Sequence, residues 1–312
     1  MAPRDRDPLP EEVRRMVGLE PVPNLSPEIN PLLAGRVRLG NAIQNGIEPP
    51  EELEHDVILK GKVHVLYAGA GMGKTLLALK LIKNAIERGE NVIYLDTENM
   101  ERIVSERLSA LGVDPELVDR YLFYLPSPHM PGSKRAAAEY SDMLDKVKPS
   151  LIVFDSWINF LAGAGLSENE NTDIAHWAVV YVHPARDRGT AVILLDHVPH
   201  DGSHARGATR KKDEADVVWR LRKTKHFDRD SVGEITLQLE KDREGWLPPS
   251  VTYSIGGTMD GFTCERSAGT FEPPAENGGL EKSHEGALEA LHILGEATDK
   301  EWKKAASVGP FW

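Results

Sequence analysis

The stretch Ala68-Gly69-Ala70-Gly71-Met72-Gly73-Lys74-Thr75 decides the fold of this chain. It directly follows an apolar run at 63–67 (Val-His-Val-Leu-Tyr) and leads into residues 76–82 (Leu-Leu-Ala-Leu-Lys-Leu-Ile), which have helical spacing. A strand, a glycine-rich turn, Gly-Lys-Thr and a helix together form the sequence context of a phosphate-binding loop. A glycine-rich turn without a ligand is the alternative, and it leaves Gly-Lys-Thr in this register unexplained. The stretch therefore predicts a site for a nucleoside triphosphate.

The residue types of this loop suit a bound triphosphate. Glycines let backbone N–H groups curl around a phosphate without a Cβ in the way, and the positive end of the new helix faces the same anion. The residues expected to surround the phosphates are Gly69, Ala70, Gly71, Met72 and Gly73. Lys74 is expected to reach the β- and γ-phosphates, and Thr75 to place its hydroxyl on Mg²⁺. Ala68 stands where the strict pattern has Gly, a change that the loop tolerates if the residue keeps a negative φ.

Composition narrows the class of protein. The 312 residues are enough for one full α/β domain with extensions, and 40% of them are hydrophobic. The net charge of −12 argues against a protein coated in nucleic acid but permits a locally basic channel. A single cysteine, Cys264, excludes a disulfide framework. Residues 1–7 lack the apolar core of a signal peptide, and no apolar run approaches the roughly 20 residues of a membrane span. We expect a cytoplasmic protein without a membrane partner.

Short apolar segments alternate with stretches of helical spacing between residues 63 and 195. The predicted strands are 63–67, 91–95, 121–125, 151–154 and 191–195. The predicted helices are 75–88, 100–111, 136–146 and 172–188. This alternation predicts an α/β fold, a doubly wound and mostly parallel sheet covered by helices on both faces. Three later segments, 216–221, 234–241 and 251–255, are separated by turns and are interpreted as an antiparallel extension of that sheet.

Composition also divides the chain. Residues 1–50 are rich in Pro and charge, with short helical patterns at 11–19 and 33–44, and we interpret them as an arm that packs on the core or on a neighbour. A disordered leader is the alternative. Residues 51–271 form the predicted core, and 272–286 a linker. In the last segment, 287–312, two short helices resemble the opening of a winged-helix module.

Two acidic strand ends are expected to face the phosphate loop. Asp155 follows the apolar strand 151–154 and is expected to hold Mg²⁺ through water. Since the next residue is Ser156 and not a second acid, the general base has to come from elsewhere. We expect the strand 91–95 to lie beside the strand 63–67, which places Glu98 at the γ-phosphate as the base that activates water. Asp96 is the competing assignment.

Polar and basic residues follow the strand 191–195. His197 is expected to contact the γ-phosphate and to report hydrolysis to the loop after it, with a capping histidine as the alternative. Residues 206–225 hold eight Lys or Arg against three acids, an inversion of the overall charge that a nucleic-acid contact would require. The predicted contacts are Arg206, Arg210, Lys211 and Lys212, and a solvated basic face is the alternative.

Lys241 and Arg243 lie two residues apart near the end of the predicted strand 234–241 and so share a face of the sheet. A cation pair on a peripheral hairpin suits the γ-phosphate of an adjacent subunit better than that of its own chain, as an arginine finger does. The alternative is a solvated pair at a hairpin tip.

The order of these motifs resembles the RecA-type ATPases, over about residues 55–255. The motifs that carry the resemblance are the phosphate loop, Glu98, Asp155-Ser156, Asp196-His197, Arg206-Gly207-Ala208-Thr209 and Lys241-x-Arg243. The segment Arg107-Leu108-Ser109-Ala110-Leu111-Gly112, nine residues after Glu98, resembles the branch of hexameric replicative helicases that contains plasmid RepA. That branch implies stacking of Arg107 on adenine and a γ-phosphate sensor at His197. The helicase of that branch has the Arg that acts on a neighbouring subunit at the position where this chain has Asp216. Lys241 and Arg243 are instead similar to the pair that acts in this way in DnaB-type helicases.

The resemblance implies an ATP-hydrolysing ring motor with Mg²⁺, most readily a hexameric replicative DNA helicase with ATP sites between subunits. Its implied partners are further copies of the chain, single-stranded DNA and other replication proteins. Two other classes stay open. One is an ATP-gated DNA-binding filament, recombinase-like or a loader ATPase, without helicase activity. The other is a small-molecule phosphotransferase, which would need a lid with arginines from the same chain.

Overall fold

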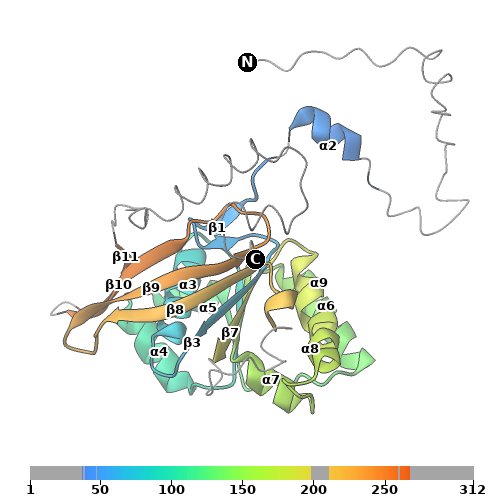
Figure 1. Ribbon diagram of the computed structural model, residues 1–312. Helices are drawn as coiled ribbons and strands as arrows, with labels where there is room; N and C mark the ends of the chain where they lie inside the picture. Colours follow the sequence, from blue (N-terminus) through green and yellow to red (C-terminus); the bar gives the residue numbers. More distant parts are fainter. Residues whose placement is uncertain (1–36, 38, 47, 198–210, 259–260, 268–312) are drawn as a thin grey trace, which may run out of the picture. The chain divides into compact units, whose positions relative to one another are not determined.

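The computed structural model describes residues 37, 39–46, 48–197, 211–258 and 261–267 (Figure 1). The chain divides into two compact units, residues 1–49 and 50–312. In the first unit the described residues include the helix α2 (Leu39–Asn45), on which Leu39 and Ile43 are exposed. The predicted helix at 11–19, the linker 272–286 and the segment 287–312 lie outside the described residues.

The second unit contains a nine-stranded sheet in the order β11-β10-β9-β8-β3-β7-β6-β4-β5. The strands that run parallel to one another are β3 (Val63–Ala68), β4 (Val92–Asp96), β5 (Leu122–Pro126), β6 (Leu151–Asp155), β7 (Ala191–His197) and β8 (Val217–Lys225). The antiparallel strands β9 (Val232–Asp242), β10 (Ser250–Thr258) and β11 (Gly261–Arg266) extend the sheet beyond β8. The predicted α/β fold with a mostly parallel sheet is confirmed.

Two details of the predicted topology were wrong. The segment at 216–221 belongs to β8, which pairs in parallel with β3, so the antiparallel extension starts one strand later than expected. The strand at 91–95 does not lie beside the phosphate-loop strand, because β7 and β6 separate β4 from β3. Hydrophobic pattern identifies a buried strand but does not order the strands within a sheet. Two further features were not predicted: β11, and a small two-stranded sheet of β1 (Glu52–Glu54) and β2 (Ile58–Leu59).

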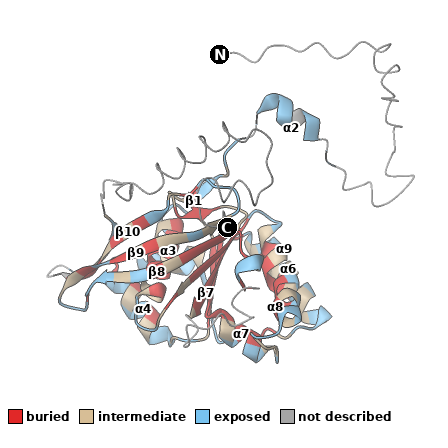
Figure 2. Ribbon diagram, in the orientation of Figure 1, coloured by how far each residue is buried: buried red, intermediate tan, exposed pale blue. Residues whose placement is uncertain are grey.

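Helices cover both faces of the sheet. One face packs against α3 (Lys74–Glu87), α4 (Glu101–Ala110) and α5 (Pro115–Tyr121). The other packs against α6 (Lys134–Val147), α7 (Trp157–Gly163), α8 (Asn171–Trp177) and α9 (His183–Arg186) (Figure 1). The short helices α5 and α7 were not predicted. Because successive side chains of a strand point to opposite faces, Val65 joins one core and Leu66 the other. Burial is accordingly concentrated in the central strands (Figure 2).

The predicted helix at 172–188 is a helical run with a wider turn inside it. Between α8 and α9 lies the π-helical turn η2 (Ala178–Val182), and the His183 N–H donates to the Ala178 carbonyl five residues back. Pro184 follows directly. It has no N–H to donate, and its ring would clash with the carbonyl four residues earlier in a regular α-helix. The wider turn accommodates both constraints. Across the part of the chain that the structure describes, no helix combines the length and apolar character that a membrane span needs.

The turn between β8 and β9 folds back onto the neighbouring strands. The Gly257 N–H donates to the Asp228 carbonyl at 2.9 Å, and a Cβ on Gly257 would lie 1.5 Å from the Arg229 carbonyl oxygen. Phe227, in the same turn, is 9% exposed and would lie 3.1 Å from a Cβ on Gly73 of the phosphate loop. The close approach at Gly257 therefore helps to fix the turn that packs against the phosphate loop.

Gly257→Ala is expected to lower the free energy of unfolding by more than about 2 kcal/mol, because the new methyl group overlaps a backbone oxygen that cannot move without displacing the turn. Urea unfolding measures the change. Gly163→Ala is the matched control, since a Cβ there meets nothing within 4 Å, and it should stay within about 1 kcal/mol of wild type. Equal stability of the two variants would contradict the close packing of the turn.

Candidate functional site: a phosphate loop and the strand ends around it

The phosphate loop connects β3 to α3 by a turn that requires glycine. Gly71 and Gly73 have φ values of 68° and 102°, in the left-handed region. Gly73 is the N-cap of α3, and no side chain caps the first turn of that helix. Its backbone N–H groups and the positive helix end are therefore available to an anion. Ala68 ends β3 and is not among the described non-glycine residues that have a positive φ. An alanine where the strict pattern has glycine therefore costs no backbone strain at this position.

Lys74 connects this loop to the end of β7. Its Nζ donates to the carbonyl oxygens of Ala68 at 2.9 Å and Gly69 at 3.3 Å, and lies 3.3 Å from His197 Nδ1. Lys74 is 6% exposed. Burial lowers its pKa, against the opposing charges of Glu98 and Asp155. A buried ammonium group held by neutral acceptors is well placed to exchange them for a phosphate.

Glu98 lies at the far end of the same chain of contacts. His197 Nε2 is 2.9 Å from Glu98 Oε1, so the imidazole bridges Lys74 and the Glu98 carboxylate. The loop after β4 thus reaches across the end of β6 to β7, although β4 is not beside β3. Burial favours the neutral form of Glu98, but hydrogen bonds, including that with His197, and the charge of Lys74 outweigh it and lower its pKa.

Asp96, the competing base, has a different environment. It is fully buried, and its Oδ1 accepts hydrogen bonds from the backbone N–H groups of Glu98 and Asn99, both at 2.9 Å. The side-chain amide of Asn99 donates to the same oxygen at 3.2 Å. Asp96 therefore orders the turn that carries Glu98.

Asp155 ends β6 beside the first turn of α3. Thr75 Oγ1 and the Tyr94 hydroxyl each donate to Asp155 Oδ2 at 3.0 Å. Asp155 Oδ1 is buried and has no hydrogen-bond partner among the described residues. Burial, and then the charges of Asp96 and Glu98, raise the pKa of Asp155 to about 6. A carboxylate oxygen without a partner, next to a threonine hydroxyl and other acidic groups, fits a divalent cation whose remaining ligands come from phosphates and water.

Arg107 lies in the last turn of α4. Its Nη1 donates to Asn99 Oδ1 at 3.1 Å, which links it to the Asp96 turn. The contact places Arg107 close to the phosphate-loop site, while its expected stacking on adenine stays a prediction.

The predicted nucleic-acid contacts fall into three groups. Arg206 and Arg210 lie outside the described residues. Lys212 is partly exposed and pairs with Glu240 at 2.5 Å. Lys211 is 5% exposed, and its Nζ lies 3.0 Å from Asp196 Oδ2 and 2.9 Å from Glu168 Oε2. A buried lysine with two carboxylate partners does not fit a direct contact with nucleic acid. The charge of Lys211 can be counted from the sequence, but its two carboxylate partners come from residues distant in the chain and are seen only in the fold.

Lys241 and Arg243 lie at the opposite edge of the sheet from the phosphate loop. Asp242 pairs with Val217, which pairs with His64 near the start of β3, whereas the loop follows the end of β3. Lys241 Nζ donates to the carbonyls of Lys212 at 2.8 Å and Ala215 at 2.7 Å. Arg243 Nη2 donates to the Asp213 carbonyl at 3.2 Å, and its Nε lies 3.5 Å from Asp216 Oδ1. The pair therefore holds segment 212–216 of its own chain and does not reach its own phosphate loop.

Three residues of the site were missed. Tyr94 and Asn99 donate to Asp155, and Thr97 ties the ends of β4 and β6 together, since its N–H donates to the Asp155 carbonyl at 2.6 Å. Of these three residues, only Tyr94 has a signal in the sequence that could have indicated its role. It is a tyrosine inside an apolar strand, and a buried hydroxyl needs a hydrogen-bond partner.

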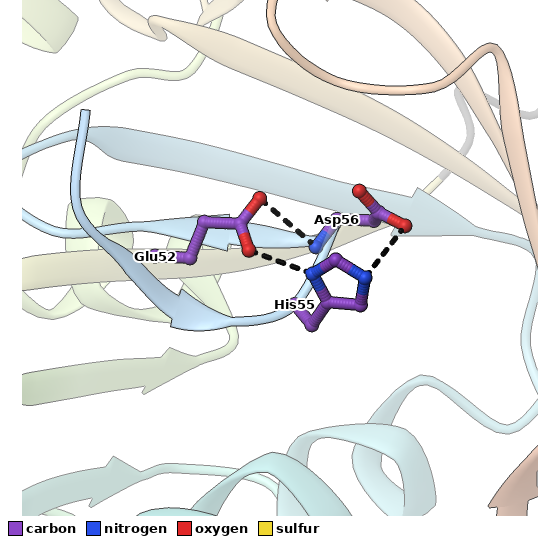
Figure 3. A group of neighbouring side chains, drawn as sticks. All are labelled: Glu52, His55 and Asp56. Carbon is purple, nitrogen blue, oxygen red and sulfur yellow. Dashed lines mark hydrogen bonds and ion pairs between the residues drawn. The ribbon is translucent and has the colours of Figure 1, made fainter. Parts of the chain in front are cut away.

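A second group of carboxylates lies away from this site. Glu52, His55 and Asp56 approach one another at the β1–β2 turn (Figure 3). His55 Nδ1 is 2.8 Å from Glu52, and Arg266 Nη2 donates to Asp56 at 2.6 Å. The exposed group is thus a local ion-pair network whose charges already have partners.

The geometry defines a P-loop protein of the RecA type, with the loop, a strand-end acid and a lysine–histidine–glutamate chain at one edge of a parallel sheet. The chain matches the family model described as an AAA domain over residues 30–203, more than half of its length, and belongs to that family.

Individual relatives match parts of the chain that differ in length. Protein RecA of Malacoplasma penetrans is 38% identical over 82 residues, 26% of this chain and 21% of that protein. DNA repair and recombination protein RadB of Methanococcus maripaludis is 35% identical over 116 residues, 35% of this chain and 49% of that protein. DNA repair protein RadA of Mycobacterium tuberculosis is 23% identical over 197 residues, 62% of this chain and 37% of that protein. The chain thus spans between about a fifth and a half of the length of these relatives.

The raised pKa of Asp155 has a measurable effect on stability. Between pH 4 and 6 the folded state holds a proton that the unfolded chain has released, so the contribution of this group to stability falls as the pH rises through about 6. Asp155→Asn removes the buried charge. Without nucleotide and in EDTA, the variant should unfold with a free energy about 2 kcal/mol above wild type at pH 8 and equal to it near pH 4.

Urea unfolding across this pH range measures the difference. Asp145→Asn is the matched control, because the hydrogen bond with Arg188 lowers the pKa of the exposed Asp145. Loss of the Asp145 charge should therefore slightly destabilise the protein at neutral pH. An Asp155→Asn variant less stable than wild type at pH 8 would contradict the assignment.

Proposed function

We propose that this protein is a RecA-type ATPase that acts on DNA as part of a homo-oligomer. The observation that carries the proposal is the continuous contact from the phosphate loop through Lys74 and His197 to Glu98. It joins a cation for the β- and γ-phosphates, a polar sensor and a base in one chain of hydrogen bonds. The relatives named RecA, RadA and RadB support an action in DNA repair or recombination.

In this proposal each residue has a distinct role. The backbone N–H groups of 69–73 bind the phosphates of ATP, and Lys74 neutralises the charge that develops on the γ-phosphate. Glu98 orients the attacking water and takes its proton, while His197 contacts the γ-phosphate. Thr75 and Asp155 would hold Mg²⁺, which would supply positive charge to offset that of the phosphates.

The contacts of His197 suggest how hydrolysis would be sensed. His197 holds Glu98 and Lys74 together, and the residue before it, Asp196, forms the buried ion pair with Lys211. The described residues on either side of segment 198–210 are thus His197, which contacts Lys74, and Lys211, which pairs with Asp196. Loss of the γ-phosphate would change the partners of His197, and we propose that segment 198–210, with Arg206 and Arg210, responds by changing its contact with single-stranded DNA.

Two assemblies are compatible with this role. The resemblance to hexameric replicative helicases favours a closed ring, whereas the relatives named as recombination proteins favour an ATP-gated filament or loader without helicase activity. Electron micrographs with single-stranded DNA and an ATP analogue distinguish rings from open helices. A small-molecule phosphotransferase would instead release ADP at a rate that single-stranded DNA does not change.

Lys74→Ala should lower ATP turnover by several orders of magnitude, because it removes the cation at the β- and γ-phosphates. Glu98→Gln should retain ATP binding but hydrolyse slowly, since only the activation of water is lost. Steady-state ADP release and equilibrium binding of a fluorescent ATP analogue measure the two effects. Lys146→Ala, at an exposed pair with Asp142, is the control and should match wild type.

Wild-type turnover in a folded Lys74→Ala protein would overturn the proposed function. Asp96→Asn should mainly lower stability, because Asp96 orders the turn before α4. If a folded Asp96→Asn variant traps ATP while Glu98→Gln does not, then Asp96 is the base.

We further propose that Lys241 and Arg243 act on the ATP of a neighbouring subunit. Their position at the far edge of the sheet supports this, because a head-to-tail assembly brings opposite edges of adjacent subunits together. On assembly the pair would exchange the carbonyls of 212–215 for the neighbour's γ-phosphate. That exchange would also release the segment next to Lys211 and Lys212.

A mixing experiment tests the shared site. Arg243→Ala and Lys74→Ala proteins, each inactive alone, should regain part of the ATPase activity when mixed, because some interfaces then join an intact Lys74 to an intact Arg243. A fluorescence assay confirms subunit exchange. If exchange occurs without recovery, Arg243 acts within its own chain, where it holds Asp213 and Asp216.

A further inference from the structure

The two oxygens of the Asp155 carboxylate have different environments. Oδ2 accepts hydrogen bonds from Thr75 Oγ1 and the Tyr94 hydroxyl, each at 3.0 Å, and from the Asn99 amide at 3.4 Å. Oδ1 is equally buried but has no partner among the described residues. A buried carboxylate oxygen without a donor is costly unless something else approaches it. All of these donors therefore fix the carboxylate from one side and leave the other oxygen free.

Of these donors, Tyr94 is the one held most rigidly. It is fully buried in β4, where it pairs with Val153 of β6, two residues before Asp155. Its ring packs against Tyr124, with centroids 5.5 Å apart. The ring belongs to the core between the sheet and α3, so the hydroxyl cannot swing away without a cavity opening. The Thr75 hydroxyl, by contrast, is itself expected to become a ligand of the metal ion.

We infer that Tyr94 is a positioning residue of the metal site, which holds Asp155 Oδ2 so that Oδ1 faces the coordination sphere of Mg²⁺. The inference rests on the proposed function, since it needs Thr75 and Asp155 as the metal-binding pair. Partners of this kind orient carboxylates at metal sites, and their removal usually costs tenfold or more in metal affinity. The hydroxyl is buried and donates to Asp155 Oδ2, so in this inference it acts through that carboxylate.

The alternative is that Tyr94 is simply a core residue whose hydroxyl needed an acceptor. The two views predict different results for Tyr94→Phe, which keeps the ring and removes one oxygen. If the hydroxyl positions Asp155, the Mg²⁺ concentration for half-maximal binding of a fluorescent ATP analogue should rise about tenfold. Binding of the same analogue in EDTA should be unchanged, because the phosphate loop is intact.

Tyr124→Phe is the matched control. Tyr124 also has a hydroxyl that hydrogen-bonds to an acidic side chain, since it donates to Asp96 Oδ2 at 3.3 Å at the end of the neighbouring strand β4. Its removal should leave the Mg²⁺ half-saturation at the wild-type value. Tyr94→Leu removes the same hydroxyl with a differently shaped side chain, and should shift the Mg²⁺ half-saturation in the same direction as Tyr94→Phe. Urea unfolding of all three variants separates an effect on stability from one on metal binding.

An unchanged Mg²⁺ half-saturation in Tyr94→Phe, or an equal rise in Tyr124→Phe, would overturn the inference. Its failure can be told apart from failure of the proposed function, because the readout is binding and not turnover. If wild type binds the analogue with Mg²⁺ but does not hydrolyse ATP, the proposed function fails while the Tyr94 comparison still gives an answer. If wild type hydrolyses ATP and Tyr94→Phe binds Mg²⁺ normally, only the role of Tyr94 is excluded.

Discussion

The parallel pairing of β3 with β7 is the constraint on which the site depends. Its register places Ala68, the last residue before the glycine turn, opposite His197. Lys74, at the start of α3, consequently comes within 3.3 Å of the imidazole, and the imidazole within 2.9 Å of Glu98. A slip of one residue would turn His197 to the other face of the sheet and break both contacts. The buried apolar residues along these strands, Val192 to Leu195 on β7 among them, fix the register.

The site concentrates negative charge in a place with little water. The charges of Glu98 and Asp155 act on the Lys74 ammonium, and those of Asp96 and Glu98 act on Asp155. Asp96 and Asp155 are almost fully buried. Such an arrangement is unfavourable by itself, since each carboxylate raises the energy of ionising the next. A divalent cation would offset the charge of these carboxylates and that of a bound triphosphate, which gives a physical reason for a metal ion to accompany the nucleotide at this site. The hydrogen bonds on Asp155 Oδ2 and Asp96 Oδ1 hold the acids in place.

Three other cations contact groups of their own chain in this structure. Lys211 neutralises Asp196, and Lys241 and Arg243 hold the carbonyls between 212 and 215. The segment that follows β7 is thus held at its end by several charge-assisted contacts, which are stronger than neutral hydrogen bonds. The same contacts connect the far edge of the sheet to the strand that carries His197.

The sequence by itself determined the phosphate loop, the α/β class and most of the strands. Those features rest on local chemistry: the glycines at 71 and 73 that allow a left-handed turn, and short apolar runs between amphipathic helices. It also placed Glu98, Asp155 and His197 at strand ends, where a parallel sheet brings loops to one edge. Only the tertiary structure decided the strand order, in which β7 and β6 separate β4 from β3, and the parallel direction of β8. It alone showed that Lys211 is buried, that Tyr94 donates to Asp155, and that Lys241 lies far along the sheet from the phosphate loop. These facts depend on contacts between residues distant in the chain, and local pattern carries no information about which distant partner a side chain meets.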